Sequence, residues 1–262
     1  MQFGRSNCIG SKTAESRSWM STTYRLNTWY DFRRALIAPG YKETKALNAR
    51  ASEVISHVEE KGKAITLDRD INLFRARVGG PNIMPGMPPI YPYTDSEISA
   101  PPADKASSGR FNAEGVPFLY LSTSKEVALA ETRPMPNEKC SVASFSVPQG
   151  LKVVNLIPEQ PLPGQDLSHM ERFWFDLCRD AAQQFSSNDV VQRYRSLQYV
   201  ASIFLENELD GIVYRSAFFE DHWNKPEEPW GGGTFYNYVL FDPSEASFLN
   251  SELKILKRDL SI

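Results

Sequence analysis

An arginine, a tyrosine and a glutamate lie close together in the stretch SSGRFNAEGVPFLYLSTSKEVALAET, residues 107–132. Arg110 precedes a turn that Asn112 suits, Tyr120 lies in an apolar strand pattern, and Glu131 lies in a small, apolar helix pattern. A guanidinium binds phosphate through its planar fork of donors, and a carboxylate among apolar residues costs desolvation unless a partner offsets it. These residue types favour a site that holds a charged ligand and breaks a polar bond in it.

Each of the three side chains also has a structural interpretation. Arg110 is equally typical of a solvated surface arginine, and Glu131 of a glutamate that faces solvent at a helix end. Tyr120 is typical of a core tyrosine whose hydroxyl needs a partner, or of a flat ring on which a planar ligand stacks. The residues alone leave these alternatives open.

Two further arginines and a serine are candidates for binding an anion. Arg75 and Arg77 share one face of the strand pattern INLFRARV because side chains alternate along a strand. They add positive charge if that face lines a cleft, and otherwise form the wet side of a sheet. Ser216 ends the pattern DGIVYRS, where a small hydroxyl can bind phosphate or ribose oxygens, although this position alone says little.

Composition excludes several other classes of protein. The chain of 262 residues has a formal net charge of −3, which argues against a protein that coats nucleic acid. No apolar run reaches the length of a signal peptide or a membrane span, so we expect a cytoplasmic protein. Cys8, Cys140 and Cys178 fit three unpaired thiols, and we find no metal-ligand cluster, hydrolytic triad or Walker loop. His57, on a helix without a Cys or His partner nearby, is given no role.

The elements that must position these residues follow from hydrophobic periodicity. We expect helices near residues 23–38, 42–62, 125–133, 167–185 and 193–207. We expect strands near residues 64–67, 71–78, 116–122, 141–147, 151–156, 210–216 and 234–242. Thr123 and Glu126 match a capping box at the start of the third helix, with Ser124 as a rival cap. The pattern predicts an α+β fold with a mostly antiparallel sheet flanked by helices.

Two segments lie outside this regular pattern. Residues 1–20 are polar and serine-rich, which indicates a mobile lead-in. Residues 79–109 form a long loop with seven of the eighteen prolines, as expected for either a lid or a passive insert. A polar loop with the run Gly231-Gly232-Gly233 separates the last two expected strands.

Four blocks of the sequence resemble the RES domain family in the right order. They are GRFNAEGVPFLYLS, ALAE, LDGIVYRS and YNYVLFD, and the resemblance covers roughly residues 66–245. It implies a split sheet similar to that of ADP-ribosyltransferases, and it divides the chain into a helical N-terminal extension (1–65) and a catalytic domain (66–262). The N-terminal helices, the 79–109 loop and the added helices near 157–192 depart from the compact toxins of the family.

The resemblance also implies an activity and a site. Many members are toxins that destroy NAD and are held inactive by an Xre-type antitoxin, and some use inorganic phosphate as the acceptor. Arg110, helped by Arg75, is expected to bind the pyrophosphate, and Tyr120 to pack against the nicotinamide. Glu131 is expected to stabilise the ribose as it becomes positively charged, with Asn112 and Ser216 in the substrate-binding set.

Several alternatives stay open at this level. NAD is expected as a substrate without a further cofactor, and the acceptor is water, phosphate or, for an ADP-ribosyltransferase, a macromolecule. A binding module without turnover is the alternative outside the enzymes. The additions to the toxin core also suit an effector delivered into a target cell and paired with an immunity protein. The oligomeric state is undetermined.

Overall fold

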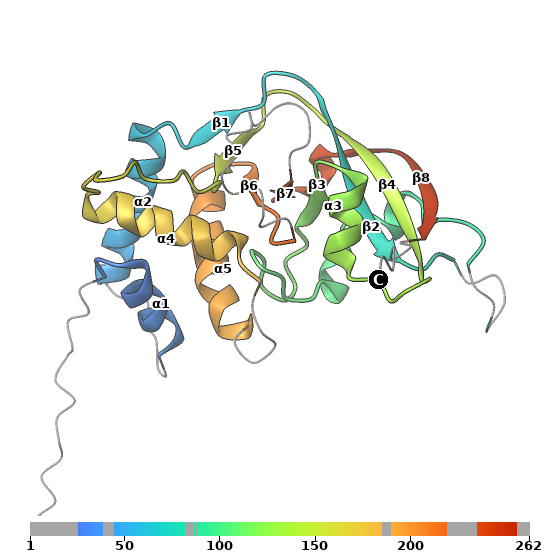
Figure 1. Ribbon diagram of the computed structural model, residues 1–262, viewed down its shortest axis with the longest axis horizontal. Coiled ribbons are helices and arrows are strands. Elements are labelled where there is room, and N and C mark those ends of the chain that lie inside the picture. Colours follow the sequence, from blue (N-terminus) through green and yellow to red (C-terminus); the bar gives the residue numbers. More distant parts are fainter. Residues whose placement is uncertain are drawn as a thin grey trace, which may run out of the picture.

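The computed structural model describes residues 26–38, 45–81, 86, 89–184, 190–218 and 235–255. Within these ranges the helices are α1 (Trp29–Ile37), α2 (Lys45–Glu60), α3 (Lys125–Thr132), α4 (His169–Ala182) and α5 (Val190–Glu206). The strands are β1 (Ala64–Thr66), β2 (Ile71–Val78), β3 (Leu119–Ser122), β4 (Lys139–Val147), β5 (Lys152–Asn155), β6 (Gly211–Arg215), β7 (Tyr236–Leu240) and β8 (Ser247–Ile255). The predicted α+β fold, with a mostly antiparallel sheet flanked by helices, is confirmed (Figure 1).

The strands form one sheet that is nearly divided in two. Their order is β1-β5-β6-β7-β3-β2-β4-β8, and every neighbouring pair is antiparallel except β5 and β6. Strand β2 pairs with β4 along its whole length but with β3 only through Phe74 and Ser122. We call this junction between β2 and β3 the seam. The predicted split of the sheet is therefore present, and the seam joins a half of five strands to a half of three.

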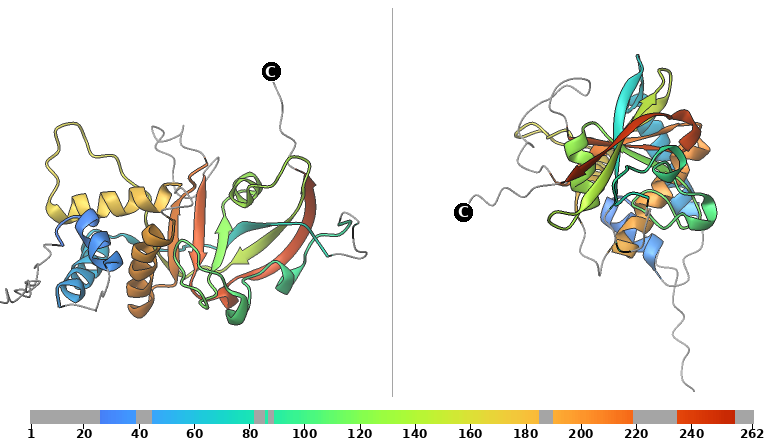
Figure 2. Two further views of the ribbon diagram at one scale, coloured as in Figure 1. Left: turned by 90° about the horizontal axis from the view of Figure 1, so that it is seen from below. Right: turned by 90° about the vertical axis from the view of Figure 1, so that its right-hand side faces the viewer.

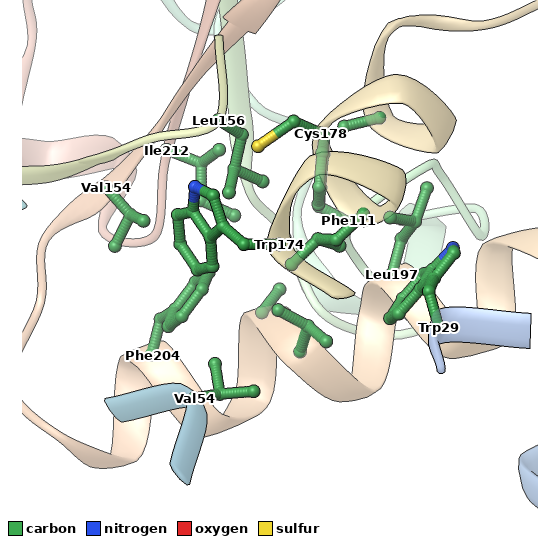
Figure 3. Packing of buried hydrophobic residues seen from close by; sticks show 14 of the residues in the cluster. Trp29, Val54, Phe111, Val154, Leu156, Trp174, Cys178, Leu197, Phe204 and Ile212 are labelled. Atoms are coloured by element: carbon green, nitrogen blue, oxygen red, sulfur yellow. The ribbon is translucent and has the colours of Figure 1, made fainter. Parts of the chain in front are cut away.

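The helices are distributed unevenly over the two halves. Helices α1, α2, α4 and α5 gather at one end of the molecule, beside the five-stranded half, and α3 lies against β2 (Figures 1 and 2). Their shared core includes Trp29 of α1, Val54 of α2, Trp174 of α4, Phe204 of α5 and Ile212 of β6 (Figure 3). Burial of this apolar surface is what fixes the helices on the sheet.

A second apolar cluster covers the other face of the sheet. It includes Leu73 of β2, Leu121 of β3 and Tyr238 of β7, together with Ile98 from the long loop. Ile98 is fully buried, so the described part of the 79–109 loop packs on the sheet at this point. Whether the loop is a lid or a passive insert stays a prediction.

The N-terminal helix is tied to the rest of the fold by a buried carboxylate. Asp180, near the end of α4, accepts hydrogen bonds from Trp29 Nε1 and Arg33 Nη1, both at 2.6 Å and both on one oxygen. The expected domain boundary between residues 65 and 66 falls inside β1, which pairs with β5. The two-part division stays a prediction, while the helices before β1 share their core with the sheet.

Most local expectations from the sequence agree with the structure. The predicted bounds of β2 are confirmed. The Thr123–Glu126 capping box is wrong: its rival Ser124 is the N-cap of α3 and accepts from Val127 N at 3.2 Å. Strand β8, which pairs with β4, was not predicted. Cys140 and Cys178 are buried free thiols, whereas Cys8, the lead-in and the glycine run at 231–233 lie outside the described residues. No described helix has both the length and the apolarity to cross a membrane.

Candidate active site

Glu131 lies near the end of α3 and is bound through one of its two oxygens. Ser216, just after β6, donates its hydroxyl to Oε1 at 2.8 Å, and Asn237 of β7 donates its amide nitrogen to the same oxygen at 2.6 Å. No described residue donates to Oε2, and the side chain remains partly exposed. Glu131 is therefore a fixed carboxylate with one oxygen left for a ligand.

Arg75 lies on β2 at the seam and has few partners. Its Nη1 donates to the carbonyl oxygen of Tyr120 at 3.1 Å, across the gap where β2 and β3 diverge. Its Nε is buried without a hydrogen bond, and no described carboxylate lies within ion-pair distance. Burial, and then the like charge of Arg77, lowers the pKa of Arg75 to about 10, so it stays charged at neutral pH. A half-buried cation with a buried, unbonded Nε and no counter-ion among the described residues is the arrangement expected of an anion-binding residue.

Arg77 has partners in the long loop. Its Nη1 donates to the carbonyl oxygen of Glu97, and its guanidinium lies 4.5 Å from the ring centroid of Tyr93. Like Arg75 it lies on the face opposite Phe74, but it is exposed. The expectation that Arg75 and Arg77 line one cleft stays a prediction. Arg75 lies in the seam, whereas Arg77 contacts the long loop.

Arg110 is bound to the carboxyl end of α4. Its Nη1 donates to the carbonyl oxygens of Ala181 and, at 2.8 Å, of Gln183. Its guanidinium also lies 5.5 Å from the ring centroid of Tyr214 and 5.7 Å from that of Tyr194. A cation at this end of a helix compensates unpaired carbonyls and the helix dipole. Arg110 therefore performs a structural task in this protein, and its expected contact with pyrophosphate stays a prediction.

Asn112 and Tyr120 lock the turn between Arg110 and β3. The Tyr120 hydroxyl donates to Asn112 Oδ1 at 2.7 Å and accepts from Phe111 N at 3.0 Å. The Asn112 amide nitrogen donates to three backbone carbonyls, those of Ser107, Ala113 and Val116. Gly109 is needed here because a Cβ would lie 2.3 Å from Asn112 Oδ1. The polar atoms of Asn112 and Tyr120 are thus used within the turn, which leaves only the Tyr120 ring for a ligand.

The structure brings together some predicted site residues and adds others. Glu131 and Ser216 are in direct contact, and their roles in the site stay a prediction. Ser122 and Asn237 were missed, although Asn237 lies between the tyrosines of the block YNYVLFD. The signal that could have found Asn237 is an amide in a strand whose neighbours are all apolar or aromatic, since such a residue needs a buried partner.

The chain is similar to known sequences and structures. The sequence model of the RES domain matches residues 89–259, which is more than half of the chain. The chain belongs to the RES domain family. No curated protein matches it. A chain of the M. tuberculosis MbcT–MbcA toxin–antitoxin complex is 13% identical, with a TM-score of 0.42 over 77% of this chain and 92% of that chain. That likeness is too weak to support an argument.

The RES match includes Arg110, Tyr120, Glu131 and Ser216 but begins after Arg75. The seam is therefore formed by the matched region together with β2, which precedes it. No described residues form a group of His, Cys, Asp or Glu that could hold a metal ion.

His57 lies far from this arrangement in the fold, on α2. Its ring lies 5.1 Å from that of Trp174, and burial followed by the charge of Lys63 lowers its pKa, so it is a neutral core histidine at pH 7. It borders a cavity of about 340 Å³ between α2, α4 and residues 157–167, where Lys63 pairs with Glu159.

Proposed function

We propose that this protein cleaves the bond between nicotinamide and ribose in NAD. The observation that carries the proposal is Glu131, a carboxylate fixed through one oxygen with the other left open. Its helix α3 packs against β2, the strand that carries Arg75, a cation without a described carboxylate partner. NAD presents the complementary charges, a pyrophosphate and a ribose that becomes positively charged as its glycosidic bond breaks. Membership of the RES family supports the same assignment.

The described residues supply three parts of such a reaction. Arg75 binds the pyrophosphate, whose negative charge pairs with a guanidinium that has no described carboxylate partner. Glu131 Oε2 stabilises the oxocarbenium-like ribose, because a fixed negative charge in a partly dehydrated site favours a developing positive one. Nicotinamide leaves as a neutral molecule, so the site needs no general acid. The Tyr120 ring remains the candidate surface for the nicotinamide, while its hydroxyl is bonded within the turn.

The biological role that we propose is that of a toxin that depletes NAD. It acts in the cytoplasm of the cell that makes it or of a target cell, and an antitoxin of the Xre type or an immunity protein restrains it. NAD is the substrate, no further cofactor is invoked, and inorganic phosphate or water is the acceptor. The contacts of Glu131 and Arg75 support the proposed site, and membership of the RES family supports the toxin role.

The test is to incubate the purified protein with NAD, with and without phosphate, and to follow nicotinamide by chromatography. Glu131→Gln is a matched control, because the amide oxygen can accept both present hydrogen bonds while the charge is removed. We expect release by the wild type and a loss of about 100-fold or more in the variant at unchanged melting temperature. The second product identifies the acceptor: ADP-ribose for water, its phosphorylated form for phosphate.

Three outcomes would contradict the proposal. Nicotinamide release by Glu131→Gln at the wild-type rate would remove the role of the carboxylate. Transfer of label from NAD to a protein or nucleic acid, without free ADP-ribose, would identify an ADP-ribosyltransferase instead. No turnover together with retained NAD binding would favour a binding module.

A further inference from the structure

A buried chain of hydrogen bonds leads from β3 through β7 to Glu131. Ser122 Oγ donates to Asn237 Oδ1 at 2.7 Å, and Asn237 Nδ2 donates to Glu131 Oε1 at 2.6 Å. Ser122 and Asn237 lie directly opposite each other on neighbouring strands and are 5% and 3% exposed. Three elements therefore meet through these two bonds.

Chemistry fixes the direction of the chain independently of how the amide was oriented. An ionised carboxylate only accepts hydrogen bonds, so the amide nitrogen of Asn237 must face Glu131. Its oxygen then faces Ser122, whose hydroxyl must donate. Ser122 thus prevents the amide from turning over, and Asn237 presents a donor to Glu131 in a single orientation.

The hydrogen bonds from Asn237 and Ser216 determine which oxygen of Glu131 is available to a ligand. Asn237 of β7 and Ser216, just after the neighbouring β6, both donate to Oε1, and no described residue donates to Oε2. Two donors on one oxygen restrict rotation of the carboxylate, because turning it would break both bonds. Oε2 is then the oxygen left for a ligand.

We propose that Asn237, oriented by Ser122, is a positioning residue that holds the Glu131 carboxylate so that Oε2 meets the reacting sugar. The inference rests on the proposed function for the reaction that Glu131 serves. It goes further in assigning the geometry of that carboxylate to a Ser–Asn pair on the central strands.

A second Ser–Asn pair in the same sheet provides a control. Ser144 of β4 donates to Asn250 of β8 at 3.0 Å, on neighbouring antiparallel strands. Asn250 is exposed and makes no bond to a carboxylate among the described residues. The same chemistry is thus present at the edge of the sheet without a connection to Glu131.

The decisive variant is Asn237→Asp, which places a carboxyl oxygen where the amide nitrogen now lies. Two carboxyl groups at this distance share one proton, so the acidic form keeps a hydrogen bond to Glu131 and the basic form repels it. We divide the rate of nicotinamide release by this variant by the wild-type rate at the same pH. We expect this ratio to rise about 10-fold as the pH falls from 8 to 5. Tyr214, which lies near Glu131, stays neutral over this range because burial raises its pKa above the ordinary value of 10.

Further variants separate positioning from folding. Asn237→Ala is expected to lower kcat about 10- to 100-fold, the equivalent of one hydrogen bond to a charged group, with KM changed less than about 3-fold. Asn250→Asp is expected to keep the wild-type rate and pH profile. An unchanged kcat in Asn237→Ala, or a pH-independent loss in Asn237→Asp, would overturn the inference.

A crystal structure of Asn237→Ala tests the inference without turnover, and so separately from the proposed function. We expect the Glu131 carboxylate to leave its present position or to occupy several rotamers while the sheet is unchanged. A carboxylate that stays in place would overturn the positioning role, even if the wild type cleaves NAD. A displaced carboxylate would support it, even if the wild type releases no nicotinamide.

Discussion

Two arginines that look alike in the sequence have opposite surroundings in the structure. Arg110 donates to the carbonyl oxygens at the end of α4 and lies over the rings of Tyr194 and Tyr214. Arg75 makes a single described hydrogen bond, keeps a buried Nε without an acceptor, and has no described carboxylate partner. The first arginine stabilises the fold, whereas the second is held at a cost in desolvation.

The difference teaches which feature marks a binding residue. A side chain whose donors are matched by the protein contributes stability, and a side chain whose donors are unmatched is retained for a ligand. By that criterion Arg75 is the better candidate for the pyrophosphate, whereas Arg110 is bonded at the end of α4 and packs on the ring of Tyr214. Four predictions test this division.

The largest effect is expected for Arg75→Met, which keeps much of the side-chain length and removes the charge. The KM for NAD should rise about 100-fold, because hydrogen bonds between charged groups are lost. The melting temperature should not fall, since the desolvation cost of the cation disappears together with one bond to the Tyr120 carbonyl. Kinetics and thermal denaturation check both parts, and a melting temperature several degrees lower would contradict the division.

Arg110→Met should show the reverse behaviour. Loss of charged hydrogen bonds to two carbonyls costs about 2–3 kcal/mol, or roughly 5–10 °C in melting temperature. Below the transition, the KM for NAD should change less than about 5-fold, because Nη1 of Arg110 is bonded to carbonyl oxygens at the end of α4. Calorimetry and kinetics at low temperature measure the two quantities, and a variant of full stability that no longer binds NAD would sink this assignment.

Tyr120→Phe tests the turn between Arg110 and β3. The substitution leaves Phe111 N and Asn112 Oδ1 without their partner, which costs about 1–3 kcal/mol and lowers the melting temperature by several degrees. The ring is kept, so nicotinamide release should stay within about 5-fold of the wild type. A loss as large as that of Glu131→Gln would instead assign the hydroxyl to the chemistry.

The smallest effect is expected for Arg77→Gln. Its guanidinium contacts Glu97 and Tyr93, so NAD affinity at pH 7 should change less than about 3-fold. In the wild type, affinity should be flat from pH 6 to pH 8.5 and weaken toward pH 10, where Arg75 loses its proton, as its lowered pKa requires. Removing Arg77 should shift the alkaline loss of NAD affinity to higher pH, because the positive charge that lowers the pKa of Arg75 is gone. Binding measured by fluorescence titration across this range tests it, and a loss at the same pH would contradict the coupling of the two arginines.

Hydrophobic periodicity predicted much of the fold. The alternation in INLFRARV gave the bounds of β2, and the Ser124 cap and Pro134 bracketed α3. Strand β8 was missed because SFLNSELKI alternates weakly and obtains its pairing from β4, which is distant in the sequence. Local pattern cannot reveal a strand that tertiary pairing stabilises.

The site was only partly predictable for a similar reason. Glu131 and Ser216 were found through family blocks, and they are in contact. Arg110 was assigned through its residue type and the Gly-Arg block, whereas its acceptors at the end of α4 lie 71 and 73 positions along the chain. Asn237 was missed because its significance depends on Ser122 and Glu131, which the fold brings together. Residue type suggests a role, and the matching of donors to acceptors decides it.

The most direct test of the account is calorimetric binding of NAD to Glu131→Gln, which should bind without turnover, and to this variant combined with Arg75→Met or Arg110→Met. We predict that Arg75→Met abolishes measurable binding and that Arg110→Met, kept below its melting transition, preserves it. Binding lost with Arg110→Met and kept with Arg75→Met would contradict the account and return the pyrophosphate to Arg110.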